Sequence, residues 1–377
     1  MRRPRLRCAL LAATCTATAG PLRGQASDAL YARFNALSGW DMRGYSFDPG
    51  IGTKTASEWS MPVVVVAPLG RKASVDVSTH YVSGRVDAYS GSPATLSGFT
   101  DTQVRFLYTV DRDRLVGTLS LNLPTGNHTL SPTEFEVAAA LGSNYLSFPV
   151  ANFGTALGMT GGLAYAERLG PWNVGASSSL RYVATYQPFA NDTLSYKPGL
   201  EVRIRAGADR LIGHASRLLV GLTVSTFSTD VYSGSSAVLP GWYSPGTRFI
   251  GELGFVRVVG RSTVSFSAWD YYRPTGLTNA GPNPDTQENV LNGELRVTYP
   301  VSPRVQLEPM VAFRQWSPAD YLGGRLKSGG LLVRAALTDR LSTTVAGRYD
   351  GGWTLARGHG FAFLQGYGAS VFLRYER

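Results

Sequence analysis

The side chains with the most chemical potential in this sequence are charged residues that occupy every second position of extended segments. In "PGLEVRIRAG" and "LNGELRVTYP" these charged residues alternate with apolar or small ones. Because side chains of a β-strand alternate between its two faces, each segment carries its charges on one face and its apolar residues on the other. The charged residues on such faces are Glu201, Arg203, Arg205, Glu294, Arg296, Glu308, Arg314, Arg334 and Arg348.

Two interpretations of this charged face imply different chemistry. Carboxylates and guanidinium groups around a pore would select ions, whereas opposite charges on neighbouring strands would pair and solvate an interior. The mixed signs of the charges favour pairing. We therefore predict that these residues line a lumen without strong ion selectivity.

No residue pattern indicates catalysis or a bound metal. The four histidines, His80, His128, His214 and His359, are isolated in the sequence, whereas zinc sites typically show closely spaced ligands. The G-x-S-x-G motif of many hydrolase nucleophiles does not occur. We predict no enzyme activity, no cofactor and no metal, with a barrel hydrolase as the weakest alternative.

The first 26 residues resemble a secretory signal peptide. "MRRPRLR" is positively charged, "CALLAATCTATAGPL" is apolar, and "GQA" supplies small residues before Ser27, so we predict cleavage after Ala26. Cleavage removes five arginines and no acidic residue, which lowers the formal net charge from +10 to +5. It also removes Cys8 and Cys15, the only cysteines. The remaining chain has no thiol chemistry and little charge for binding nucleic acid.

The alternation of period two continues through the rest of the chain, as in "KASVDVSTHYV", "RLVGTLSLNL" and "DRLSTTVAGRYD", and helical periodicity is nowhere sustained. Seven short turns alternate with longer loops. The longer loops are expected near residues 83–100, 124–153, 187–196, 232–246, 274–288, 317–324 and 350–360. This rhythm predicts an all-β antiparallel meander of about 14–16 strands, with short turns at one end and long loops at the other.

Three features favour an apolar face toward lipid. The alternation appears in nearly every strand, and the loops are segregated by length. Aromatic residues concentrate near the strand ends, as they do at the two interfaces of a membrane barrel. After the signal, no segment approaches the roughly 18–20 apolar residues of a spanning helix. We predict a transmembrane β-barrel in a bacterial outer membrane, with its apolar face toward lipid, periplasmic short turns and extracellular long loops. The alternative is a soluble β-sandwich with the faces reversed.

The predicted organisation has three parts. Residues 1–26 form the signal peptide, residues 27–58 are either a plug or a first strand, and residues 59–377 form the barrel. We expect a monomer whose partners are outer-membrane lipid, lipopolysaccharide, the barrel-assembly machinery and a small hydrophobic ligand.

Two stretches resemble a known family. They are "GFTDTQVRFLYTVDRDRLVGTLSLNLPTG" (98–126), with its "FTDT" and "LNLPTG" motifs, and "FPVANFGTALGMTGGLAYAERLGPWNVGASSSLRYVATYQPF" (148–189). Both are similar to outer-membrane transporters associated with phenol-degradation pathways, which are relatives of the long-chain fatty-acid (FadL-like) channels. The resemblance implies a monomeric barrel, often plugged by its N-terminal segment, that passes hydrophobic molecules inward.

The loop expected at 124–153 is rich in apolar residues, including Tyr145, Phe148 and Phe153. These three would form either a capture site for a hydrophobic ligand or part of a loop that folds on itself or over the barrel mouth. We predict a channel for passive uptake of small hydrophobic or amphipathic compounds such as aromatics, fatty acids and alkanes. The alternatives are a general porin and a structural or adhesive barrel that binds partners through its loops.

Overall fold

The structure is a computed structural model of the 377-residue chain that describes residues 33–110, 114–234, 241–319, 323–355 and 361–377. The predicted signal peptide, residues 27–32 and His359 lie outside these ranges, as do the tip of the predicted "DRDR" turn and parts of three predicted loops.

The elements follow one another with few helices between the strands. The wall strands are β1 (Asn35–Phe47), β2 (Thr53–Pro68), β3 (Ala73–Ala88), β4 (Ala94–Phe99), β5 (Thr102–Thr109), β6 (Leu115–Leu123), β7 (Gly158–Leu169), β8 (Trp172–Val183), β10 (Glu201–Ile212), β11 (Ser216–Phe227), β14 (Arg248–Val259), β15 (Ser262–Arg273), β18 (Glu288–Pro300), β19 (Val305–Pro318), β20 (Gly324–Ala336), β21 (Leu341–Leu355) and β22 (Phe361–Glu376). A second, smaller sheet contains β9 (Ser195–Lys197), β12 (Asp230–Ser233), β13 (Gly241–Ser244), β16 (Gly276–Thr278) and β17 (Gly281–Asn283). The helical elements are η1 (Pro49–Ile51), α2 (Pro132–Leu141) and η2 (Pro284–Thr286).

The wall closes because its first and last strands pair. β1 pairs antiparallel with β2 on one side and with β22 on the other, from Asn35 opposite Glu376 to Phe47 opposite Leu364. β4 and β5 both pair with β3 and share one position in the wall, so the 17 described strands of the main sheet form a 16-strand barrel. A closed sheet has no free edge, as backbone in a bilayer requires. The predicted all-β meander barrel is confirmed, at the upper end of the strand range.

The two faces of the wall are oriented as the alternation predicts. On β18 and β19, Leu295 and Val311 point outward and are 42% and 58% exposed, whereas Arg296 and Glu308 point inward and are 6% and 1% exposed. An apolar outer face around a closed antiparallel barrel is the architecture of bacterial outer-membrane proteins. The predicted location is therefore confirmed, and the β-sandwich alternative is wrong.

Of the two alternatives predicted for the N-terminal segment, a first strand is the one observed, so the barrel starts before the expected boundary at residue 59. Residues 35–47 form the wall strand β1 and do not fill the lumen as a plug. Within the described residues, the barrel therefore begins at Asn35 and not at residue 59. The pairing that fixes β1 joins residues more than 300 positions apart, such as Asn35 and Glu376, so a local pattern does not reveal it.

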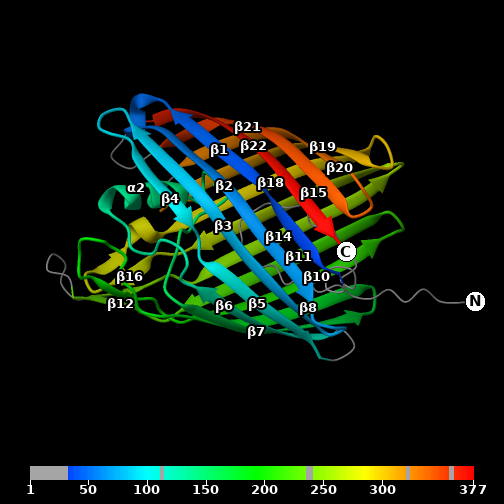
Figure 1. Ribbon diagram of the computed structural model, residues 1–377, viewed down its shortest axis with the longest axis horizontal. Coiled ribbons are helices and arrows are strands. Elements are labelled where there is room, and N and C mark those ends of the chain that lie inside the picture. The colour runs from blue at the N-terminus through cyan, green and yellow to red at the C-terminus, as the bar shows by residue number, and fades with distance from the viewer. Residues whose placement is uncertain (1–32, 111–113, 235–240, 320–322, 356–360) are drawn as a thin grey trace, which may run out of the picture.

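The two ends of the barrel differ, as Figure 1 shows. The β2–β3 turn and both described chain ends lie at the end without helix α2, whereas α2, β12 and β16 lie at the opposite end. The predicted loop at residues 83–100 is wrong in extent, because β3 continues to Ala88 and β4 begins at Ala94. Strand pairing between Tyr81–Val86 and Ala94–Phe99 extends this hairpin toward the long-loop end.

Helix α2 is an element that the strand periodicity did not predict. Ser131 begins it with a capping box: the Ser131 hydroxyl accepts from the Glu134 amide, and the Glu134 carboxylate accepts from the Ser131 amide at 2.8 Å. Pro132 follows at the first helical position, where its missing N–H costs nothing. The spacing "SPTE" was a readable signal for this helix. Among the described residues, no helix is long and apolar enough to cross a membrane.

Val311 and Ala312 test the assignment of the two faces. Val311→Arg places a charge on the outer face near the middle of β19, where it should lower the free energy of unfolding in a bilayer by about 2–4 kcal/mol. Ala312→Arg places the same charge on the inner face opposite Glu294 and should cost much less. Reversible denaturant titration of both variants in lipid vesicles measures the difference. Equal costs for the two would contradict the assignment.

Candidate functional site

The candidate site is the segment between β6 and β7, residues 124–157, which turns into the barrel and is called the inner loop below. Asp101, in the break between β4 and β5, holds both ends of this loop. Its Oδ1 accepts from the amide of Gly126 at 3.1 Å, and its Oδ2 accepts from the amide of Thr155 at 2.7 Å. One carboxylate thus ties the entry and the exit of the loop to the same point of the wall.

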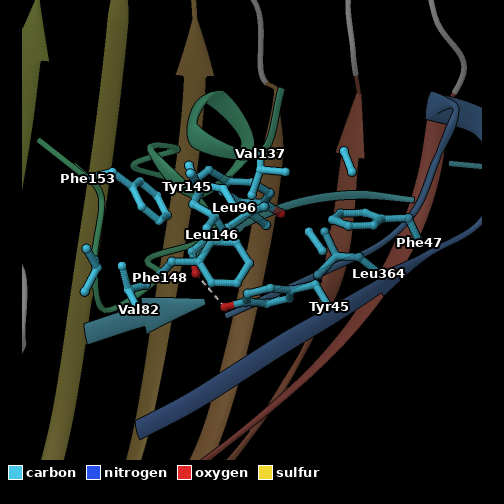
Figure 2. Close-up of a cluster of buried hydrophobic side chains, with 14 of the residues drawn as sticks. Tyr45, Phe47, Val82, Leu96, Val137, Tyr145, Leu146, Phe148, Phe153 and Leu364 are labelled. Carbon is cyan, nitrogen blue, oxygen red and sulfur yellow. Dashed lines mark hydrogen bonds between the residues drawn. The ribbon is translucent and has the colours of Figure 1, made fainter. Parts of the chain in front are cut away.

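An apolar core fixes the middle of the inner loop against the barrel wall. Val137 and Leu141 of α2 and Phe148 are 0%, 0% and 2% exposed. Their neighbours in this core include the inward side chains Tyr45, Val82, Leu96, Leu326 and Leu364. Figure 2 shows the labelled side chains of the loop and of the wall turned toward one another, with the Tyr45 ring edge-on to that of Phe148. The interior of the barrel is therefore apolar and filled on this side.

Polar contacts hold the loop backbone to strands on one side of the barrel. The Tyr45 hydroxyl of β1 donates to the Leu146 carbonyl at 2.6 Å, and the Glu58 carboxylate of β2 accepts from the Val150 amide at 2.9 Å. Arg43 of β1 donates to the Ser147 carbonyl. These bonds satisfy backbone groups that the fold buries, which removes a cost of about 1–3 kcal/mol for each group.

Contacts with the other side of the wall come from residues around Tyr145. The Tyr145 ring stacks on Trp316 of β19 at 5.5 Å, and its hydroxyl donates to the Trp353 carbonyl of β21 at 2.7 Å. Burial raises the pKa of Tyr145, so the phenol stays protonated and keeps donating. Arg314 of β19 donates to the carbonyls of Asn144 and Tyr145 at 3.3 and 3.2 Å. The inner loop therefore joins β1 and β2 to β19 and β21 through the barrel interior.

The three residues expected to contact a ligand all lie in this packed region. Tyr145, Phe148 and Phe153 are 3%, 2% and 3% exposed. Of the two alternatives for this loop, folding onto the barrel is the one observed, and the loop goes further by entering it. A ligand has no access to these side chains in the observed arrangement, so the expectation of an exposed capture loop is corrected.

The nine charged residues predicted to line the lumen form a network of mostly paired groups. Some pairs join residues two apart on one strand: Arg203 with Glu201 at 2.7 Å, Arg296 with Glu294 at 2.6 Å and Arg348 with Asp350 at 2.7 Å. Others cross between strands: Arg205 with Glu252 at 2.6 Å, and both Arg296 and Arg334 with Glu308 at 3.4 and 3.1 Å. Arg314 instead binds neutral acceptors, the loop carbonyls and Asn292 Oδ1, and lies over the Trp269 ring.

The wall on the side of β8 and β15 carries small hydroxyl side chains between these ion pairs. Ser177 and Ser179 lie opposite Arg205 and Arg203, and Ser265 and Ser267 lie opposite Arg296 and Glu294. Directly paired residues share a face of a sheet, so all four serines point inward. This part of the interior offers hydrogen bonds and balanced charge. No three Cys, His, Asp or Glu side chains of the described ranges gather as a metal site would need.

A cluster of aromatic rings lies where the inner loop meets the connection between β8 and β10. Phe135 packs edge-on to Phe189 at 5.3 Å, and Tyr186 packs against both His128 at 6.3 Å and Tyr196 at 5.7 Å. We call these five residues the mouth cluster. Phe135 is 48% exposed, so this cluster presents aromatic surface that the packed loop core does not. Burial is the main cause that raises the pKa of Tyr186 and of Tyr196.

The mouth cluster was not predicted from the sequence. The sequence places Phe135 in one expected long loop and Phe189 and Tyr196 in the next. What brings them together is the parallel bridge between Leu130 and Phe189, which joins the two loops. Local periodicity contains no signal for such a contact.

Comparisons with known proteins find resemblance in solved structures alone. No family model matches the chain, and no curated protein matches it. Similar solved structures include a FadL homologue of Pseudomonas aeruginosa (10% identity, 93% of this chain and 91% of that chain, TM-score 0.46), the CymD monoaromatic hydrocarbon channel (13%, 92% and 88%, 0.44) and a TodX monoaromatic hydrocarbon channel mutant (10%, 92% and 90%, 0.47). The sequence motifs resemble the same class of proteins.

Phe148→Ala should loosen the inner loop without opening the barrel. The substitution removes a fully packed ring, a change that costs about 3–5 kcal/mol in a protein core, and here that loss falls on the contact between loop and wall. We expect faster proteolysis within residues 124–157 and an unchanged heat-dependent shift on gels. Phe363→Ala is the matched control, because Phe363 is 59% exposed on the outer face. Equal protease resistance in both variants would contradict the packing.

Proposed function

We propose that this protein is a passive channel that admits small amphipathic compounds through the outer membrane, with the inner loop as its constriction. The observation that carries the proposal is that the inner loop is fixed inside the barrel, against β1–β4 on one side and β19 and β21 on the other. A segment held in this way narrows the passage, and none of its contacts given above is with the hydroxyl- and charge-lined wall of β8, β10 and β15. The proposal needs no coupling to an energy source.

The mouth cluster supports an amphipathic substrate. Aromatic faces such as that of Phe135 bind the apolar part of a ligand by stacking or edge-on contact. The serines and ion pairs beyond offer partners for a polar or charged group of the same ligand. A small aromatic acid or a short fatty acid has both parts. Its apolar part would bind the aromatic mouth cluster, and its polar group would bind the serines and ion pairs beyond.

A general porin is the second candidate, and a specific observation favours it. Water and hydrophilic solutes can form hydrogen bonds with the inward side chains of this wall as readily as amphipathic compounds can. These side chains are Ser177, Ser179, Ser265 and Ser267 and the paired charges beside them. The two functions differ in whether the mouth cluster contributes to flux.

Removing the Phe135 and Phe189 rings from the mouth cluster distinguishes a channel for amphipathic compounds from a general porin. We expect Phe135→Ala/Phe189→Ala to lower the influx of benzoate into proteoliposomes about fivefold, since one aromatic contact is worth about 1 kcal/mol, and to leave arabinose influx unchanged. Phe361→Ala/Phe363→Ala, on the outer face of β22, is the matched control. Both fluxes unchanged in the mouth variant would favour a general porin. If neither benzoate nor arabinose enters through the wild-type protein, a structural or adhesive barrel would be favoured.

A further inference from the structure

The short turns at the end opposite α2 repeat one arrangement of side chains. In six of the described turns an exposed aliphatic residue lies next to an exposed arginine. The pairs are Leu69 with Arg71, Leu169 with Arg168, Leu211 and Ile212 with Arg210, Val258 and Val259 with Arg257 and Arg261, Val301 with Arg304, and Leu337 with Arg340. We call this set the basic rim.

Each aliphatic residue of the rim is strongly exposed. Leu169 is 59% exposed, and Leu69, Leu211, Val259 and Val301 are each 54% exposed. Leaving such side chains in water forfeits about 25 cal/mol for every Å² of apolar surface, and here the loss recurs in turn after turn. An apolar surrounding for the rim would remove that cost.

Few carboxylates near these turns balance the rim. Among the described residues of the turns and the adjoining positions, Glu167 pairs with Arg114 at 3.1 Å, Asp209 with Arg217 at 2.9 Å and Glu376 with Arg374 at 2.7 Å, all arginines outside the rim. Asp339 is the remaining carboxylate in these turns. Among the carboxylates that the structure describes in and beside these turns, too few remain to balance the positive charge of the rim.

The rim also follows the circumference of the barrel. Its turns connect β2 to β3, β7 to β8, β10 to β11, β14 to β15, β18 to β19 and β20 to β21, which are hairpins distributed around the closed wall. A globular protein partner would contact one arc of such a ring. A lipid leaflet surrounds the barrel and contacts all of it.

We propose that the basic rim binds the headgroups of anionic phospholipids in the leaflet at the short-turn end. Guanidinium groups pair with phosphate oxygens in a bidentate geometry, and the neighbouring aliphatic side chains enter the boundary between headgroups and acyl chains. Basic residues near an anionic membrane surface each add to the attraction. This lipid site lies outside the lumen and is independent of what the channel passes.

Native mass spectrometry of the detergent-refolded chain with phosphatidylglycerol or phosphatidylcholine tests the rim. The rim variant Arg71→Gln/Arg261→Gln/Arg304→Gln should retain phosphatidylglycerol about tenfold less than the wild type. The control Lys54→Gln/Arg325→Gln/Lys327→Gln removes the same charge from exposed positions toward the other end and should bind as the wild type does. A heat-dependent gel shift verifies that each variant is folded, and Arg168→Gln/Arg257→Gln/Arg340→Gln replaces a rim variant that fails this check.

Other outcomes would overturn the proposal. Unchanged phosphatidylglycerol binding in a folded rim variant would exclude the rim as the site. An equal loss in the control would show that net charge alone governs binding. Capture of peptidoglycan fragments by the wild type without a preference for phosphatidylglycerol would assign the rim to a different anionic partner. The variant Leu169→Asn/Ile212→Asn/Val259→Asn should bind phosphatidylglycerol and phosphatidylcholine less tightly, to the same extent. Unchanged binding of both lipids would contradict the role proposed for the aliphatic side chains.

Discussion

The contact between helix α2 and the inner surface of β3 is the constraint on which the barrel interior depends. A Cβ atom at Gly84 would lie 2.3 Å from Leu141 Cδ1 and 2.9 Å from Val137 Cγ1, so glycine alone leaves room for the helix at this point of the wall. With α2 in this position, Phe148 packs against Tyr45, Val150 bonds to Glu58, and Tyr145 contacts Arg314 and the Trp353 carbonyl. The position of the inner loop inside the barrel therefore follows from one close approach between a helix and a strand.

The membrane determines how the rest of the chain distributes its polarity. The apolar face of the wall strands is turned toward lipid, so charged and hydroxyl side chains line the lumen, where most of the charges are paired. Apolar packing inside the barrel survives where a segment other than the wall supplies the partner, as the inner loop does. One side of the interior is therefore filled by apolar side chains, and the other side is polar. The aromatic mouth cluster lies at the boundary between the two.

Much of the wall could be predicted from the sequence, because alternation with period two is local. It revealed which residues of β18 and β19 face lipid, and the seven short turns gave the strand count to within two. The inner loop could not be predicted in the same way: its bond from Val150 to Glu58 spans 92 positions, and its core draws on strands from both ends of the chain. Helix α2 is the intermediate case, since the capping box of Ser131 and Glu134 was present in the sequence but lies outside any strand pattern. The apolar character of the loop correctly drew attention to Tyr145, Phe148 and Phe153. In the structure these side chains pack against the barrel wall and do not form an exposed ligand site.

The most direct test of a loop fixed inside the barrel is the single-channel conductance of Gly84→Val compared with Gly161→Val in planar bilayers. Valine at residue 84 would collide with Leu141 and Val137, whereas a Cβ atom at residue 161 meets no atom within 4 Å. If α2 and the inner loop set the constriction, Gly84→Val displaces them and its conductance rises above that of the wild type, while Gly161→Val conducts as the wild type does. Equal conductance of all three folded proteins would contradict the placement of the constriction.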